Sequence, residues 1–117
     1  MPPIPILLER RGKRSLKPKP DNTHTSNDST KVPAGSSVMF TTETGVTGVS
    51  ITFTGRSPFA SNVVDYNQTL QVRAAFDPGN KQKNSYKYRC TGRAATGEDL
   101  DGSDDGGSGG EVEIIKP

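Results

Sequence analysis

Cys90 is the residue with the strongest nucleophile and metal-ligand chemistry, and it ends the alternating segment Tyr86-Lys87-Tyr88-Arg89-Cys90. A thiolate attacks electrophiles and binds soft metals, and Arg93 nearby would favour that ionised form. However, Cys90 shares its phase with the two tyrosines, which predicts a buried cysteine that fills the core as a small hydrophobe. As the single cysteine, it also excludes an internal disulfide.

A catalytic use of Cys90 would need a base, and the chain has one histidine, His24, far away in sequence. No third group can be identified to orient such a pair, and no convergent pair of carboxylates is apparent. We therefore expect no enzyme. A redox or metal-handling protein that uses Cys90 is the alternative.

A second chemical pattern is a run of oxygen donors at alternating positions. The donors are Asp99, Asp101, Ser103 and Asp105, and residues 101–106 match the first half of an EF-hand calcium loop. The twelfth position of that loop is Val112 instead of a bidentate glutamate, and no flanking helices are predicted. We predict a solvated hairpin loop without metal or cofactor, with weak calcium binding as the alternative.

Basic side chains gather in two places. Six lie within residues 10–19, and five more form a stripe on two neighbouring predicted strands: Arg73, Lys81, Lys83, Lys87 and Arg89. A stripe with exposed aromatic rings would indicate single-stranded nucleic acid. Because the tyrosines have the opposite phase, a solvated sheet face is favoured and nucleic acid is not an expected partner. The run over 10–19 can pair with the acidic residues of 98–105.

The composition limits the class of protein. At 117 residues the chain makes one domain with a thin core, because only 29% of the residues are hydrophobic and there are 13 glycines and 9 prolines. The longest apolar run, Ile4 to Leu8, contains Pro5, so neither a membrane span nor a signal-peptide core is predicted. As the chain stands we expect a cytoplasmic monomer, and an exported mature form is the alternative.

Apolar and polar residues alternate in four segments, as in strands with one face on a core. These segments are 37–41, 49–54, 70–76 and 86–90, and a fifth short strand is predicted over 112–115. Turns are predicted at Pro33-Ala34-Gly35 and at Asp77-Pro78-Gly79-Asn80. At most one helical turn is expected, between Ser57 and Asn67. The sequence therefore predicts an all-β sandwich of six to eight strands.

The first third of the chain is ambiguous. Ile4, Ile6 and Leu8 alternate, so we predict an edge strand over 5–10, where Pro5 is tolerated; a disordered basic tail over 1–30 is the alternative. Residues 12–31 are predicted to be an extended basic and polar loop, and residues 97–110 a flexible, acidic, glycine-rich loop. Residues 1–117 together are taken as one sandwich domain.

In their order and spacing, several of these segments resemble the cupredoxin, or blue-copper, family. The matching segments are Ile6-Leu7-Leu8, Val32-Pro33-Ala34-Gly35-Ser36-Ser37-Val38-Met39-Phe40, Val49-Ser50-Ile51-Thr52-Phe53, and the last two predicted strands over 86–90 and 110–114. The resemblance implies a Greek-key β-sandwich of the cupredoxin-like kind. An immunoglobulin-like sandwich is the alternative.

The copper ligands of that family are missing at the matching positions. The first histidine would fall at Gly48 or Val49, the second near Arg93, and the methionine within 96–100. A blue-copper site needs two imidazoles and a thiolate, so the resemblance implies the frame without the copper site. The expected function is a non-enzymatic binding or interaction module, whose ligand or protein partner the sequence does not name.

Overall fold

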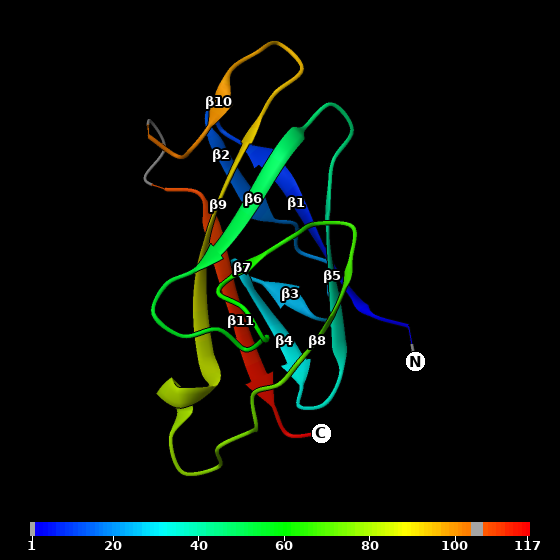
Figure 1. Ribbon diagram of the computed structural model, residues 1–117, viewed down its shortest axis with the longest axis vertical. Coiled ribbons are helices and arrows are strands. Elements are labelled where there is room, and N and C mark those ends of the chain that lie inside the picture. The colour runs from blue at the N-terminus through cyan, green and yellow to red at the C-terminus, as the bar shows by residue number, and fades with distance from the viewer. Residues whose placement is uncertain (1, 104–106) are drawn as a thin grey trace.

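The computed structural model describes residues 2–103 and 107–117, which form two β-sheets packed one behind the other (Figure 1). The described residues contain eleven strands and one short 3₁₀ helix: β1 (Ile4–Arg11), β2 (Ser15–Pro18), β3 (Thr25–Ser26), β4 (Ser29–Pro33), β5 (Ser37–Thr42), β6 (Thr47–Phe53), β7 (Val63–Val64), β8 (Thr69–Gln71), η1 (Lys81–Asn84), β9 (Ser85–Arg93), β10 (Asp99–Leu100) and β11 (Gly109–Ile115). The predicted all-β sandwich is confirmed. The number of strands exceeds the expected six to eight because β3, β7 and β10, of two residues each, are included.

The two sheets have mixed strand directions. One sheet has the order β2-β1-β5-β8, and the other has the order β3-β4-β11-β9-β6-β7 with β10 paired to β9. Most neighbours are antiparallel, but β1 runs parallel to β5 and β11 runs parallel to β4. The first and last strands therefore lie in opposite sheets, each beside a strand distant in sequence.

Aromatic rings join the two sheets across the core. Phe40 of β5 meets Tyr88 of β9 edge-on, with ring centroids 5.3 Å apart, and Phe53 of β6 lies 5.4 Å from the same tyrosine ring. Phe59, which follows β6, continues the cluster at 5.5 Å from Phe53. Such contacts add to the burial of apolar area. The inward phase predicted for Tyr86, Tyr88 and Cys90 is confirmed, since all three are buried.

The predicted strand at the start of the chain is present as β1, but it is not an edge strand. It lies between β2 and β5. Pro5 fits this position because β2 pairs only with the part of β1 from Leu8 to Arg11, so one side of β1 is unpaired beside the proline. Because Ile6 and Leu8 are fully buried, the alternative of a disordered tail is wrong as well.

The expected loop over 12–31 is also corrected, since it contains β2, β3 and most of β4. Asn27 and Asp28 form the two-residue turn between β3 and β4, with φ of 51° and 62°. Two left-handed residues in succession make a type I′ turn, whose twist suits a hairpin. Before β3, the Asp21 carboxylate accepts the backbone N–H groups of residues 23, 24 and 25. Burial acts to raise the pKa of Asp21, but these three bonds together outweigh it and lower the pKa to about 2.

The segment 70–76 forms a strand only at its start. The strand β8 ends at Gln71, and the N–H groups of Arg73 and Ala74 then both bond to the carbonyl of Pro58. No helical turn forms between Ser57 and Asn67, in keeping with the limit of at most one, and β7 lies there. A 3₁₀ turn forms at η1, because the side chain of Asn80 accepts the N–H of Gln82 and caps it.

Ser108 joins the two sheets at the edge where β2 passes the beginning of β11. Its hydroxyl accepts the N–H of Leu16 at 2.8 Å and donates to the carbonyl of Leu16 at 3.1 Å. The hydroxyl of Ser15 adds a bond to the carbonyl of Gly107 at 2.9 Å. A side chain thus takes the place of a strand neighbour for the backbone of β2.

Ser108→Ala should destabilise the fold by about 1–3 kcal/mol, because it removes the Ser108 bond to the N–H of Leu16 and leaves the carbonyl of Leu16 with the weak thiol donor of Cys90. Urea unfolding of the variant measures the change. The matched control is Ser50→Ala on the exposed face of β6, where we expect less than about 0.5 kcal/mol. Equal midpoints for the two variants would show that Ser108 does not hold this edge.

Candidate functional site

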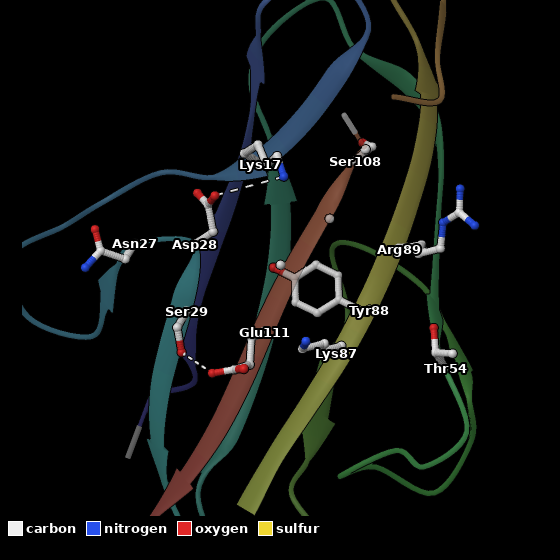
Figure 2. A pocket seen from close by; sticks show the side chains of 13 residues that line it. Lys17, Asn27, Asp28, Ser29, Thr54, Lys87, Tyr88, Arg89, Ser108 and Glu111 are labelled. Atoms are coloured by element: carbon white, nitrogen blue, oxygen red, sulfur yellow. Dashed lines mark hydrogen bonds and ion pairs between the residues drawn. The ribbon is translucent and has the colours of Figure 1, made fainter. Parts of the chain in front are cut away.

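An open hollow of about 670 Å³ lies where β11 begins, between β9 and the β3–β4 turn (Figure 2). Residues of several structural elements surround it. The residues used below are Lys17 from β2, Asp28 from the turn, Tyr88, Lys87 and Arg89 from β9, and Glu111 from β11.

Two glycines at the start of β11 make the hollow. Gly109 has a φ of 127°, and a Cβ there would lie 2.1 Å from the carbonyl oxygen of Tyr88. At Gly110 a Cβ would lie 2.7 Å from the carbonyl oxygen of Asp28 and 2.8 Å from the hydroxyl of Tyr88. Real side chains cannot be accommodated at either distance, so β11 begins as bare backbone between β9 and the turn.

The two acids beside the hollow are already engaged. Asp28 contacts Arg11 at 2.7 Å and Lys17 at 4.0 Å, and Glu111 accepts the hydroxyl of Ser29 at 2.8 Å (Figure 2). The hydrogen bond to Asp28 raises the pKa of Arg11, against a smaller effect of burial. Asp28 is therefore paired with two cations, whereas Glu111 accepts a neutral hydroxyl.

The cations of β9 are less compensated. Lys87 and Arg89 are both exposed, and neither forms an ion pair within residues 2–103 and 107–117. Lys87 lies opposite Glu111 in the β9–β11 register, whereas the direct neighbours of Arg89 are Thr52 and Gly109. Arg73, Lys81, Lys83, Lys87 and Arg89 are all exposed, as expected. The predicted stripe on two neighbouring strands is wrong, because only Lys87 and Arg89 lie on a strand, while Arg73 follows β8 and the two other lysines lie in η1.

The hydroxyl of Tyr88 is the one buried side-chain polar atom in the described part of the chain without a hydrogen-bond partner. Only 3% of Tyr88 is exposed, and its hydroxyl lies against Gly110 at the inner wall of the hollow. Burial raises the pKa of Tyr88 well above its usual value, and the neighbouring Cys90 and Asp28 add to this. The group is therefore a protonated donor at neutral pH.

Cys90 is a structural thiol. Its sulfur lies 3.5 Å from the carbonyl oxygen of Leu16 and 3.6 Å from the hydroxyl of Ser108, and these two bonds do not involve His24. Burial raises the pKa of Cys90 to about 11, although the bond to Ser108 and the charge of Lys17 oppose this. The thiol thus stays protonated at neutral pH.

Two of the oxygen donors proposed for calcium, Asp99 and Asp101, make other contacts. Asp99 of β10 pairs with Arg93 at 3.3 Å, and Asp101 accepts the N–H of Ser103, which lowers the pKa of Asp101. Asp105 lies outside the described residues. Within those residues no group of three or more histidine, cysteine, aspartate or glutamate side chains could hold a metal ion. Weak calcium binding stays a prediction.

The predicted loop over 97–110 is tied to the fold at several points. Leu100 of β10 is fully buried, and the N–H of Gly102 bonds to the carbonyl of Arg14 at 2.6 Å. Arg10 pairs with Glu98 at 3.1 Å, so the basic run and the acidic segment do meet. Bonds from Thr96 and Arg10 lower the pKa of Glu98.

The hollow was not predicted from the sequence. Gly109 and Gly110 were assigned to the loop over 97–110, and Asn27 and Asp28 to the loop over 12–31. The available signal was the Asn-Asp pair, whose residues tolerate the left-handed conformation that a two-residue hairpin requires. Nothing in the sequence indicated that this turn would lie over the beginning of β11.

Comparison with family models, curated proteins and solved structures returns no match, so the geometry itself must carry the functional argument. Across residues 2–103 and 107–117, no helix has the length and apolar character needed to cross a membrane.

Tyr88→Phe should raise the free energy of unfolding by about 1 kcal/mol, because it removes a buried hydroxyl that lacks a partner and keeps the ring. Urea unfolding checks the sign. Tyr86→Phe is the matched control on the same strand, with an expected change within about 0.5 kcal/mol. A loss of stability in Tyr88→Phe would mean that the hydroxyl has a partner in solution.

Cys90 should resist thiol reagents in the folded protein. At pH 7.5 we expect Ellman's reagent to modify the native thiol at less than about a hundredth of the rate in denaturant, since the group is buried and its thiolate fraction is small. Fast stoichiometric reaction of the native protein would instead support the redox alternative.

Proposed function

We propose that this protein is a non-enzymatic binding module, built on a cupredoxin-like Greek-key sandwich without the copper site, and that its ligand binds in the hollow over Gly109 and Gly110. The observation that carries the proposal is the unpartnered hydroxyl of Tyr88 at the wall of that hollow. A buried donor without an acceptor costs about 1–3 kcal/mol. A ligand that supplies the acceptor would recover this cost.

Packing does not account for the hydroxyl. The contacts of Tyr88 with Phe40 and Phe53 involve the rings, and phenylalanine would provide the same ring. The described residues offer the hydroxyl no hydrogen bond either. A buried polar atom that weakens the fold and makes no hydrogen bond within it is best explained by a role outside the fold.

The non-enzymatic part of the proposal is supported by the state of the reactive groups. Asp28 and Glu111 are held by ion pairs and hydrogen bonds, and the thiol of Cys90 is protonated. A general base needs a free lone pair near neutral pH, and a nucleophile needs an activating base beside it. The groups around the hollow suit binding better than either role.

The proposed frame is supported by the strand pairing. The strands β9 and β11 are adjacent and antiparallel, as the resemblance to cupredoxins implies for the last two strands. At the positions that match copper ligands, Val49 is buried in the core and Arg93 pairs with Asp99. An apolar core residue and an ion pair thus stand where that family has two of its copper ligands.

A screen of polar fragments against ¹⁵N-labelled protein tests the proposal. We expect at least one fragment to shift the amides of residues 28, 88, 109 and 110 together in a saturable titration. Tyr88→Phe should weaken that fragment at least about fivefold, the value of one lost neutral hydrogen bond, while it raises stability. Fragments that shift only other surfaces, or bind the variant as tightly as the wild type, would refute a site at this hollow.

A further inference from the structure

We infer that the ligand of this hollow carries an anionic oxygen group, a carboxylate or a phosphate. This inference rests on the proposed function and adds to it the chemical class of the ligand. It is carried by Lys87 and Arg89 of β9, which are exposed, line the hollow and form no ion pair with another described residue.

Lys87 and Arg89 reach the same side of the sheet. They are two residues apart on one strand, so their side chains leave the same face with their Cα atoms about 7 Å apart. Both line the hollow. An anion above Gly109 would thus meet two cations fixed to a central strand of the seven-stranded sheet.

We expect Arg89 to bind an anion more strongly than Lys87, because no acid lies directly opposite Arg89. Its cross-strand neighbours are Thr52 on one side and Gly109 on the other. The glycine leaves open the place where a cross-strand partner would stand. A guanidinium presents donors in a planar fork that matches two oxygens of a carboxylate or a phosphate.

The acids of the hollow do not cancel this positive charge. Asp28 is shared by Arg11 and Lys17, and Glu111 is bonded to Ser29 and faces Lys87. Among the described residues, Arg11, Lys17, Lys87 and Arg89 thus stand against these two acids. A cationic ligand would find Asp28 already paired with Arg11 and Lys17 and would be repelled by Arg89.

The free polar groups are donors. The protonated hydroxyl of Tyr88 needs an acceptor, and the ammonium of Lys87 and the guanidinium of Arg89 can only donate. Because Lys87 and Arg89 leave the face of β9 opposite to the Tyr88 side chain, one oxygen cannot reach all three groups. The inference therefore rests on Lys87 and Arg89, for which an anionic oxygen is the matching acceptor.

Glutarate and glutaramide are a matched pair of probes that share a carbon skeleton and differ in charge. In ¹⁵N titrations at low salt, glutarate or inorganic phosphate should give a saturable shift of the amides of residues 89, 109 and 110. Glutaramide should bind at least about tenfold more weakly, because charge-assisted hydrogen bonds are about twice as strong as neutral ones. Running glutarate and phosphate separately shows which anion the hollow prefers.

Arg89→Gln should weaken the preferred anion about tenfold, as expected for the loss of a charge-assisted pair. Lys81→Gln removes an equal charge from the exposed turn η1, away from the hollow, and should change the affinity less than twofold. Binding should also fall as salt is raised.

The outcomes separate this inference from the proposed function. If glutaramide or another neutral fragment binds the hollow as tightly as glutarate, or if Arg89→Gln binds glutarate normally, the anionic class is wrong and the hollow remains a binding site. If no probe of any charge shifts residues 89, 109 and 110, both proposals fail. Equal losses in Arg89→Gln and Lys81→Gln would show only non-specific charge attraction and would also overturn the inference.

Discussion

The edge-on contact between Phe40 and Tyr88 is the interaction on which the rest of the structure depends. It joins β5 of one sheet to β9 of the other with ring centroids 5.3 Å apart, in a chain that has few other large side chains with which to fill a core. Phe53 contacts the same tyrosine ring. Because aromatic rings bury the most area per residue, one such cluster can hold together two sheets that are otherwise rich in threonine, serine and glycine.

The strand β9 belongs at once to this core and to the candidate site. Its residues alternate between Tyr86, Tyr88 and Cys90 on the buried side and Lys87 and Arg89 on the exposed side. Fixing the tyrosines in the core therefore fixes the direction of the two cations. A site placed on such a central strand needs no ordering of a loop before a ligand binds, which lowers the entropic cost of binding.

Periodicity predicted the parts of the fold that are regular. The strands β5, β6, β9 and β11 and the burial of Cys90 all follow from alternation of apolar and polar residues, because each strand has one face on the core. The strands β2 and β3 escaped prediction, since their residues are polar and their stability comes from Ser108, Asp21 and the turn at Asn27 and Asp28. These are specific hydrogen bonds and backbone angles, which leave no periodic signal.

The candidate site was beyond prediction for a related reason. Its floor consists of Gly109 and Gly110, whose role is to let two backbone segments approach closely. Its wall contains a tyrosine that sequence alone assigns correctly to the core, but whose unmatched hydroxyl becomes visible only when every neighbouring atom is placed. The chemistry of the hollow thus arises from contacts between segments distant in sequence, and not from any local motif.

The position of β11 has a consequence for how the protein comes into being. This strand is the last of the described strands along the chain, yet it lies between β4 and β9 and pairs with both. During synthesis β4 and β9 must therefore wait with unpaired edges until residues 109–115 have left the ribosome. Open strand edges invite pairing with other chains, and contacts of such long range form slowly. The sheet should thus close in one late step, once residues 109–115 are present, and the nascent chain before that step is the form most exposed to aggregation and to capture by chaperones.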